Sequence, residues 1–307
     1  MNSLSDAGNR ALVVDPAAPA GVRLVDIPSP VPTDGQVLVD VHYASLNLGD
    51  LNDARSGRVP AGAVLGSDVS GVVVASSPGG PPAGSRVVGL TAGAFASRVL
   101  VPASSLAVVP DEVDLAHAAA LPVAGLAALQ SLRRAGAGSG SRVLVTGASG
   151  GVGRFAVLLA KLAGATVIAS VGSAARGEGL AADEVIVGLT GLTEPVDVVI
   201  DNVGGPQLVS VWGLLAPGGN IQSIGWSSGE PAVFPPYATV GPAKSLTSFL
   251  INVSTAGADL AELVAHVASG RLTVDVGWQG DLSEYAQAAE ALRGRKVTGK
   301  AILSARP

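Results

Sequence analysis

The 307-residue sequence contains no cysteine and only three histidines. The first absence excludes disulfide bonds, thiolate metal sites and a cysteine nucleophile. The histidines, His42, His117 and His266, are scattered along the chain, whereas a zinc site needs three or four converging ligands. We therefore interpret them as structural or surface residues and expect no metal site.

Charged and aromatic side chains are also sparse. Charged residues make up 14% of the chain, lysine occurs four times and the net charge is −5. Because a phosphate backbone would need a basic stripe, nucleic acid is not an expected partner. Aromatic residues are 3% of a chain that is 48% hydrophobic. The core must consist of Val, Leu, Ile and Ala, which suits buried parallel strands covered by helices.

Long apolar runs are missing as well. No run approaches the ~20 residues of a membrane-spanning helix, so no membrane partner is expected. The opening residues, MNSLSDAGNR, lack the basic and apolar regions of a signal peptide. A cytoplasmic location is the expectation that follows.

The hydrophobic pattern changes along the chain and predicts two kinds of architecture. Residues 11 to 110 contain short strands between Pro/Gly turns, as in QVLVDVHYASLN, where Val37, Val39, Val41 and Tyr43 alternate onto one face. This part predicts a compact, barrel-like β domain. From Ser141 apolar strands alternate with helices, which is typical of an α/β fold with a doubly wound parallel sheet.

The stretch VLVTGASGGVGRFAVLLAKLAG joins a strand to a helix through Gly147, Gly150, Gly151 and Gly153. Glycine at such a turn permits a tight bend, close approach of the backbone to a pyrophosphate and close packing of helix on strand. The N-terminus of the following helix attracts phosphate oxygens. We predict a dinucleotide site here; the alternative is a tight turn that binds no ligand.

The next strand and loop, ATVIASVGSAARGEGL, indicate which dinucleotide is bound. NAD sites usually carry an acidic residue there for the ribose 2′-hydroxyl, but the first acid in this stretch is Glu178. Ser173 and Arg176 suit a 2′-phosphate instead, so NADP(H) is the predicted cofactor. In the alternative interpretation Arg176 is a solvated residue at a helix start.

Several stretches resemble the medium-chain dehydrogenase/reductase superfamily, and within it the zinc-free quinone oxidoreductase and enoyl reductase branch. They are AALPVAGLAALQSLRRAG, the glycine-rich stretch above, VDVVIDNVGG, LAPGGNIQSIG and VTGKAIL. The resemblance implies a GroES-like β-barrel catalytic domain from residues 1–113 and 258–307, with a Rossmann nucleotide-binding domain at 114–257. It also implies a homodimer that acts on a small-molecule substrate.

The resemblance allows the metal positions of the superfamily's zinc branch to be compared with this chain. Where that branch places cysteines and a histidine–glutamate pair, the chain has Asn47, Ser67 followed by Asp68, and Val123. None of the direct ligand positions supplies cysteine or histidine. We therefore expect activity that is independent of metal.

The zinc-free branch also carries an Asn and an Asp on the cleft side of its catalytic domain, which here are Asn47 and Asp50. By resemblance Asn47 projects toward the nicotinamide; alternatively it bonds its own backbone in a turn, and Asp50 caps the following turn. A donor at the substrate carbonyl would stabilise a developing enolate. Candidates are Tyr43, Asn47, Asn52 and backbone N–H groups, although Tyr43 alternatively packs in the core.

Together with the predicted NADP(H) site, the resemblance implies an NADPH-dependent oxidoreductase that transfers hydride to a quinone or to the activated C=C of an enone or enoyl substrate. Asn52 and Ala127 replace two hydroxyls that family members carry near the nicotinamide. An NADP-binding protein without hydride transfer, or a biosynthetic tailoring reductase with an unusual substrate, therefore stays open. The predicted catalytic residues are Asn47, Asp50 and Tyr43. The predicted cofactor-binding residues are Asn47, Gly147, Ser149, Gly150, Gly151, Val152, Gly153, Ser173, Arg176, Val203, Gly225, Trp226 and Phe249.

Overall fold

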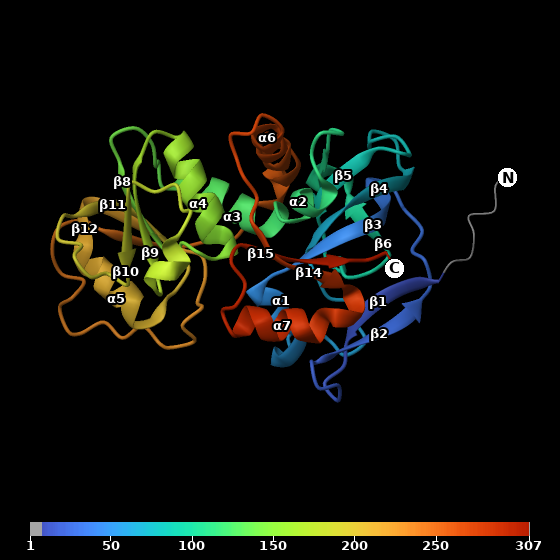
Figure 1. Ribbon diagram of the computed structural model, residues 1–307, viewed down its shortest axis with the longest axis horizontal. Helices are drawn as coiled ribbons and strands as arrows, with labels where there is room; N and C mark the ends of the chain where they lie inside the picture. Colours follow the sequence, from blue (N-terminus) through green and yellow to red (C-terminus); the bar gives the residue numbers. More distant parts are fainter. Residues whose placement is uncertain (1–7, 307) are drawn as a thin grey trace. The chain divides into compact units, whose positions relative to one another are not determined.

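A computed structural model describes residues 8–306. Most of the opening stretch MNSLSDAGNR, for which no signal peptide is expected, lies outside these residues. The chain forms two compact units (Figure 1). The first comprises Met1–Val123, Val253–Gly270 and Val274–Pro307, and the second comprises Ala124–Asn252 and Arg271–Thr273.

The first unit contains a largely antiparallel sheet of seven strands, in the order β14-β15-β3-β4-β5-β7, with β6 also paired to β3. A separate pair, β1 and β2, is antiparallel. The strands are β1 (Asn9–Val14), β2 (Val22–Ile27), β3 (Gln36–Leu46), β4 (Asp68–Ser76), β5 (Arg86–Leu90), β6 (Arg98–Pro102), β7 (Leu106–Val108), β14 (Val276–Asp281) and β15 (Lys300–Ser304). Only the β14–β15 pair in this sheet is parallel.

The prediction that Tyr43 shares the face of Val37, Val39 and Val41 on β3 is wrong. Val37, Val39 and Val41 do lie in the core, but a bulge between Val41 and Tyr43 shifts the register against β4. An inserted residue changes which side chains face inward. Ala44 therefore takes up the core face, whereas Tyr43 is half-buried and lies outside the core cluster.

Helices cover both sides of this sheet. Figure 1 shows α1 (Leu48–Ser56) and α7 (Tyr285–Arg293) together on one side, and α2 (Leu115–Ala119) and α6 (Ala256–Ala268) on the other. Helix α2 packs against β3, β4 and β5. Residues 114–123, which we had placed in the nucleotide-binding domain, therefore belong to the first unit, because their apolar face is buried against the antiparallel sheet.

The second unit is a six-stranded parallel sheet with strand order β10-β9-β8-β11-β12-β13. Its elements are α3 (Pro122–Arg134, whose first two residues lie in the first unit), β8 (Arg142–Thr146), α4 (Gly151–Leu162), β9 (Thr166–Val171), β10 (Glu184–Val187), β11 (Val196–Asp201), α5 (Gly205–Leu214), β12 (Leu215–Ser223) and β13 (Ser245–Ser248). Chain order reverses direction between β8 and β11, which makes this pair the switch point of a doubly wound sheet. The predicted α/β fold, with a doubly wound parallel sheet and a separate unit of mostly antiparallel strands, is confirmed.

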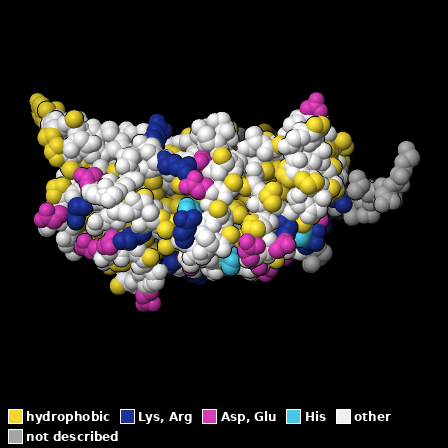
Figure 2. Space-filling view, turned by 90° about the horizontal axis from the view of Figure 1, so that it is seen from above, with side chains coloured by type: hydrophobic (Ala, Val, Ile, Leu, Met, Phe, Trp, Pro, Cys, Tyr) yellow, Lys and Arg dark blue, Asp and Glu magenta, His cyan; other side chains and the backbone are white. Residues whose placement is uncertain are grey.

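The surface shown in Figure 2 mixes charges of both signs. Lys and Arg side chains lie between Asp and Glu side chains on this face, without a large patch of one sign. No helix within residues 8–306 combines the length and the apolar character needed to cross a membrane.

Candidate functional site

The glycine-rich turn lies at the carboxyl end of β8, in the middle of the parallel sheet. Gly147 follows the strand with a φ of +60°, a conformation that favours glycine. At Gly153 a Cβ would lie 2.3 Å from the carbonyl oxygen of Gly147 and 2.6 Å from the Cα of Ala148. The missing side chain at Gly153 is therefore what lets α4 pack so closely on the turn.

Helix α4 directs its N-terminus at this turn. Gly150 is the N-cap in an extended conformation, Gly151 is the first helical residue and Val152 the second. The first N–H groups of a helix have no partner within it, and together with the helix dipole they favour a phosphate. Ser149, just before the N-cap, is 4% exposed. The predicted pyrophosphate residues thus share one turn.

Arg176 lies against the glycine-rich turn. It belongs to a short 3-10 helix, η2 (Ala174–Gly177), and its Nε donates to Ser149 Oγ at 2.9 Å. Ser173 is the exposed N-cap of that helix. Arg154 of α4 reaches the same segment, donating from Nη2 to the Glu178 carbonyl at 3.4 Å. The half-buried guanidinium of Arg176 and the hydroxyl of Ser173, which both follow β9, can donate hydrogen bonds to the oxygens of a 2′-phosphate.

A second turn follows β11, beside the first. Thr146 Oγ1 at the end of β8 donates to Asp201 Oδ1 at 2.6 Å, which ties the two central strands together. Burial raises the pKa of Asp201, against hydrogen bonds from Thr146, Gly204 and Val203. A Cβ on Gly147 would lie 3.3 Å from Val203 Cγ2. Val203 therefore borders the glycine-rich turn.

The remaining predicted cofactor residues of this unit follow β12 and β13. Backbone hydrogen bonds hold Gly225 to β11 and Phe249 to the end of β12. The indole of Trp226 covers Gly204, where a Cβ would lie 2.5 Å from the ring. Val203, Gly225 and Trp226 therefore gather at the carboxyl ends of β11 and β12, the edge at which open α/β sheets bind ligands.

The first unit holds a hydrogen-bonded group of four side chains, Asn47, Asp50, Asp68 and Lys300, which we call the Asn47 cluster. Lys300 Nζ donates to Asn47 Oδ1 at 2.5 Å and to Asp68 Oδ2 at 3.3 Å. Asn47 Nδ2 donates to Asp68 Oδ2 at 2.9 Å. The Val123 N–H donates to Asp68 Oδ1 at 2.8 Å. Two charged partners thus fix the amide of Asn47.

Local structure explains how the cluster assembles. Asn47 follows the long strand β3 and is the N-cap of α1, and Asp50 stands in the first turn of that helix. Asp50 Oδ2 accepts the Asn47 N–H at 2.7 Å, so the carboxylate does bond within its own turn. Asp68 begins β4 and Lys300 begins β15, on either side of β3 in the sheet.

Burial controls the protonation of the two carboxyl groups. Asp50 is 5% exposed, and burial together with the charge of Asp68 raises its pKa to about 7, against the Asn47 N–H and Lys300. Burial also raises the pKa of Asp68, opposed by Lys300, Asn47 and the Val123 N–H. Because Lys300 binds Asp68 directly, Asp68 is the ionised partner of that lysine. Asp50 is the carboxyl that holds a proton near neutral pH.

Lys300 was not among the residues that the sequence predicts for the site. The feature that could have identified it is its position as a lysine at the start of an apolar strand, whose next three residues, 301–303, are fully buried. Such a lysine needs a buried counter-charge. The partner lies 232 residues away at Asp68, which no local pattern predicts.

The donor set of the Asn47 cluster does not suit a zinc ion. Zinc in proteins is bound by converging thiolate, imidazole or carboxylate groups. The chain has no cysteine, and the Lys300 ammonium already binds the amide and carboxylate oxygens of Asn47 and Asp68. Across residues 8–306, no three His, Asp or Glu side chains group in a way that could hold a metal ion.

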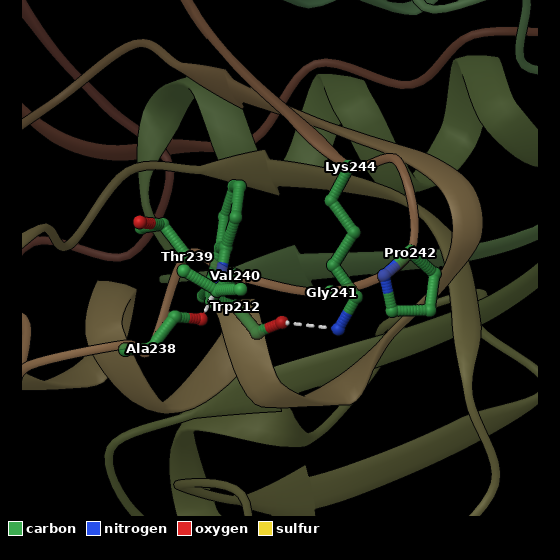
Figure 3. A pocket seen from close by; sticks show the side chains of 7 residues that line it. All are labelled: Trp212, Ala238, Thr239, Val240, Gly241, Pro242 and Lys244. Carbon is green, nitrogen blue, oxygen red and sulfur yellow. Dashed lines mark hydrogen bonds between the residues drawn. The ribbon is translucent and has the colours of Figure 1, made fainter.

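A small surface cavity of about 50 Å³ lies near α5 in the second unit (Figure 3). Lys244 Nζ donates to the Trp212 carbonyl at 3.0 Å, and Trp212 Nε1 donates to the Ala238 carbonyl at 2.8 Å. Lys244 is therefore bonded to the last turn of α5. Small-molecule sites usually enclose about 300–1,000 Å³, so we assign this cavity no ligand. The lining residues are Trp212, Ala238, Thr239, Val240, Gly241, Pro242 and Lys244.

Comparison with known proteins agrees with this geometry. Residues 33–111 match the family of the alcohol dehydrogenase GroES-like domain, and residues 180–303 match the family named zinc-binding dehydrogenase. The quinone oxidoreductase of Coxiella burnetii is 27% identical, with a TM-score of 0.84 over 97% of this chain and 99% of that one. A mycobacterial protein solved with NADPH is 29% identical, with a TM-score of 0.86 over 96% and 99% of the two chains.

A polyketide synthase is also similar to the chain. The spectinabilin polyketide synthase system protein NorB of Streptomyces orinoci is 31% identical over 317 aligned positions, which cover 94% of this chain and 14% of that protein. The chain thus spans a small part of the length of the curated synthases that it matches.

The fold and the glycine-rich turn define a class of protein that joins a GroES-like domain to a Rossmann nucleotide-binding domain. The chain belongs to the medium-chain dehydrogenase/reductase superfamily, in its zinc-free quinone oxidoreductase and enoyl reductase branch.

Proposed function

We propose that the chain is an NADPH-dependent, zinc-independent reductase of a C=C bond conjugated to a carbonyl. The observation that carries the cofactor choice is Arg176, whose guanidinium bonds Ser149 at the glycine-rich turn. The turn would hold the pyrophosphate, and Arg176 with Ser173 would hold the 2′-phosphate. The NADPH complex of a mycobacterial relative supports the same choice.

The proposed substrate class follows from the chemistry that the relatives share. A quinone oxidoreductase and a polyketide synthase are both similar to this chain. An enoyl thioester, an enone and a quinone each present an electron-poor double bond beside a carbonyl. When bound, the cofactor supplies a hydride to that double bond. The chain's own task is to orient the substrate, stabilise negative charge at the carbonyl and provide a proton.

The Asn47 cluster is the proposed catalytic group of the first unit. Lys300 and Asp68 hold the Asn47 side chain in one position, which is the kind of support that a functional residue requires. Asp50, protonated near neutral pH, is the proposed acid. Tyr43 is half-buried outside the core, so it stays a candidate for contact with the substrate.

Turnover measurements test this function. The full chain is mixed with NADPH or NADH and a panel of one quinone, one enone and one enoyl thioester, while nicotinamide absorbance and product mass are followed. We expect NADPH oxidation with a product that is two hydrogens heavier, at a rate unchanged by dialysis against a strong chelator. Tight NADPH binding without turnover of any panel member would instead favour the alternative, an NADP-binding protein without hydride transfer.

A further inference from the structure

Reduction of a conjugated double bond consumes a proton as well as a hydride, and the route of that proton is the question that the Asn47 cluster raises. Asp50 is buried in the first turn of α1, with one carboxyl oxygen, Oδ2, engaged by the Asn47 N–H at 2.7 Å. That bond leaves the other oxygen, Oδ1, to carry the proton. The proton must leave through a neighbour of Oδ1.

The charged and titratable groups around Asp50 come from three other elements as well as its own. Asp68 of β4 disfavours the carboxylate form of Asp50, and Lys300 of β15 partly offsets that effect. Burial and the charge of Asp50 raise the pKa of Tyr285 in α7, whereas the charges of Arg293 and Arg55 lower it. This balance keeps the Asp50 carboxyl protonated up to about pH 7.

Two of these neighbours cannot pass the proton on. Tyr285 is 1% exposed, its hydroxyl has no partner in the described part of the chain, and its pKa is raised to about 12. Asp68 is fully buried and is occupied by Lys300, Asn47 and the Val123 N–H. Neither Tyr285 nor Asp68 can therefore pass the proton of Asp50 out of the core.

Ser67 is the neighbour of Asp50 Oδ1 through which the proton can leave. Its Oγ donates to Asp50 Oδ1 across 3.5 Å, and because a hydroxyl hydrogen rotates to suit its partner, the same oxygen can instead accept a proton from Oδ1. The residue is half-buried whereas Asp50 is buried. The separation is long for a hydrogen bond between two oxygens, but catalytic hydrogen bonds are often long without substrate and shorten when it binds. A hydroxyl accepts one proton while donating another, so it can connect a buried acid to a reacting carbon.

We propose that Ser67 relays the proton of Asp50 to the α-carbon of the reduced substrate. This inference rests on the proposed function. The substrate gains hydride at its β-carbon, and the π electron pair of the C=C bond moves toward the carbonyl to give an enolate. The enolate α-carbon then takes the proton of Ser67 Oγ, and Ser67 takes the proton of Asp50 Oδ1. Asp50 is left as a carboxylate, which recovers its proton from solvent through the same hydroxyl.

The stereochemistry of α-protonation tests the relay independently of which step limits the rate. The full chain reduces 2-methylbut-2-enoyl N-acetylcysteamine thioester with NADPH, and the product enantiomers are separated. Wild type should give one enantiomer, with a rate that falls above about pH 7. Ser67→Ala should give both enantiomers, lose this pH dependence and lower kcat about 100-fold. Ser67→Thr, which keeps the hydroxyl, should restore wild-type behaviour.

Asp50→Asn tests the same route from its other end and should also give both enantiomers, which keeps the inference testable if Ser67→Ala does not fold. Ser97→Ala is the matched control, because Ser97 is a half-buried serine of the same unit whose hydroxyl bonds only backbone carbonyls among the contacts within residues 8–306. It should behave as wild type. Circular dichroism and NADPH titration establish that each variant is folded and binds cofactor.

The outcomes separate the relay from the proposed function. A single enantiomer and an unchanged pH profile in Ser67→Ala would overturn the relay while leaving the reductase intact. A wild type that reduces quinones but no enoyl substrate would overturn protonation at an α-carbon. A wild type that binds NADPH but reduces nothing would overturn the proposed function, and the relay with it.

Discussion

At the scale of single residues, the charge of Arg176 is expected to decide between the two nicotinamide cofactors. Arg176→Ala should weaken NADPH binding by about 1–3 kcal/mol, the contribution of a charge-assisted hydrogen bond. NADH, which has no 2′-phosphate, should bind as before. Fluorescence titration of both cofactors measures the difference.

The control for this comparison is Arg142→Ala. Arg142 begins β8, at the opposite end from the glycine-rich turn, and its Nε donates to the Pro195 carbonyl. Its removal should change neither affinity. An equal loss of NADPH and NADH binding in Arg176→Ala would show that the arginine supports the glycine-rich turn and does not bind the 2′-phosphate.

Asp50 should give the protein a measurable pH dependence of stability. Its folded pKa of about 7 lies above the ordinary value of 3.8, so the protonated carboxyl stabilises the fold. This contribution is fully present below about pH 4 and is lost as the pH rises through about 7. The free energy of unfolding of wild type should therefore fall relative to that of Asp50→Asn across this range, by an amount on the order of a few kcal/mol.

Urea unfolding at several pH values from about 5 to 8 measures this difference. Asp53→Asn is the control, because Asp53 lies on the same helix but its side chain is 38% exposed and pairs with Arg58. That variant should follow wild type at every pH. Parallel curves for wild type and Asp50→Asn would mean that the buried carboxyl is ionised throughout.

The sequence predicts single residues well where a local motif surrounds them. Gly147 and Gly153 were recognisable because a strand, a glycine spacing and a helix follow one another. The bond from Arg176 to Ser149 joins residues only 27 positions apart, in consecutive strand–helix units. Lys300 and Asn47 are 253 residues apart, and only the folded sheet brings them together.

At the scale of elements, the strength of a pattern decided what could be predicted. The apolar strands β8 and β11 of the second unit fit the predicted pattern, but no α-helix separates β10 from β11 or β12 from β13, so strands and helices do not alternate throughout. Strand β3 was also expected, but alternation cannot show the bulge between Val41 and Tyr43, because a bulge adds a residue without changing composition. Strand β14 contains Gly277 and Gly280 and no regular alternation, so its pairing with β15 was not expected.

The turn from β8 to α4 should separate folding from binding in Gly151→Val. Gly151 is the first residue of α4 and is half-buried, so a side chain there should leave most of the fold in place. A branched side chain would nevertheless occupy the space that a pyrophosphate needs at the helix N-terminus. Circular dichroism should be close to that of wild type, while NADPH titration should show no tight binding.

Gly153→Ala is the informative contrast for this experiment. A Cβ there would lie 2.3 Å from the Gly147 carbonyl oxygen, so α4 must move and both stability and binding should fall. If Gly151→Val folds and binds NADPH as wild type does, these glycines serve chain geometry alone.

At the scale of the whole molecule, the sequence predicts two architectures but not which segments belong to each. Strand and helix patterns are local, whereas the membership of a segment depends on what its apolar face packs against. Helix α2 has the composition of a Rossmann helix, yet it packs on the antiparallel sheet of the first unit. The first unit is also assembled from both ends of the chain, with β15 beside β3, which the family resemblance implied and no periodicity indicated.

Strand β13 should join two copies of the chain into a homodimer. It is the edge strand of the parallel sheet, and an edge presents unpaired backbone groups that pair readily with another strand. The segment from Ser245 to Asn252 carries no charge that would prevent such pairing, and Leu246 and Leu250 on it are 43% and 86% exposed. Since a two-fold axis brings identical patches together, two β13 strands should pair antiparallel.

Leu250→Glu tests this interface by placing a charge where the two copies would meet. Because Leu250 is 86% exposed, the change should leave the fold of one copy unaffected. Burial of the charge in the dimer should raise the dissociation constant at least tenfold, which corresponds to about 1.4 kcal/mol. Sedimentation velocity over a concentration series measures it. Val31→Glu is the matched control, since Val31 is 79% exposed in the other unit and its substitution should leave the dimer intact. A wild-type chain that sediments as a monomer at every concentration, or a Leu250→Glu chain that dimerises as tightly as Val31→Glu, would show that this edge does not carry the association.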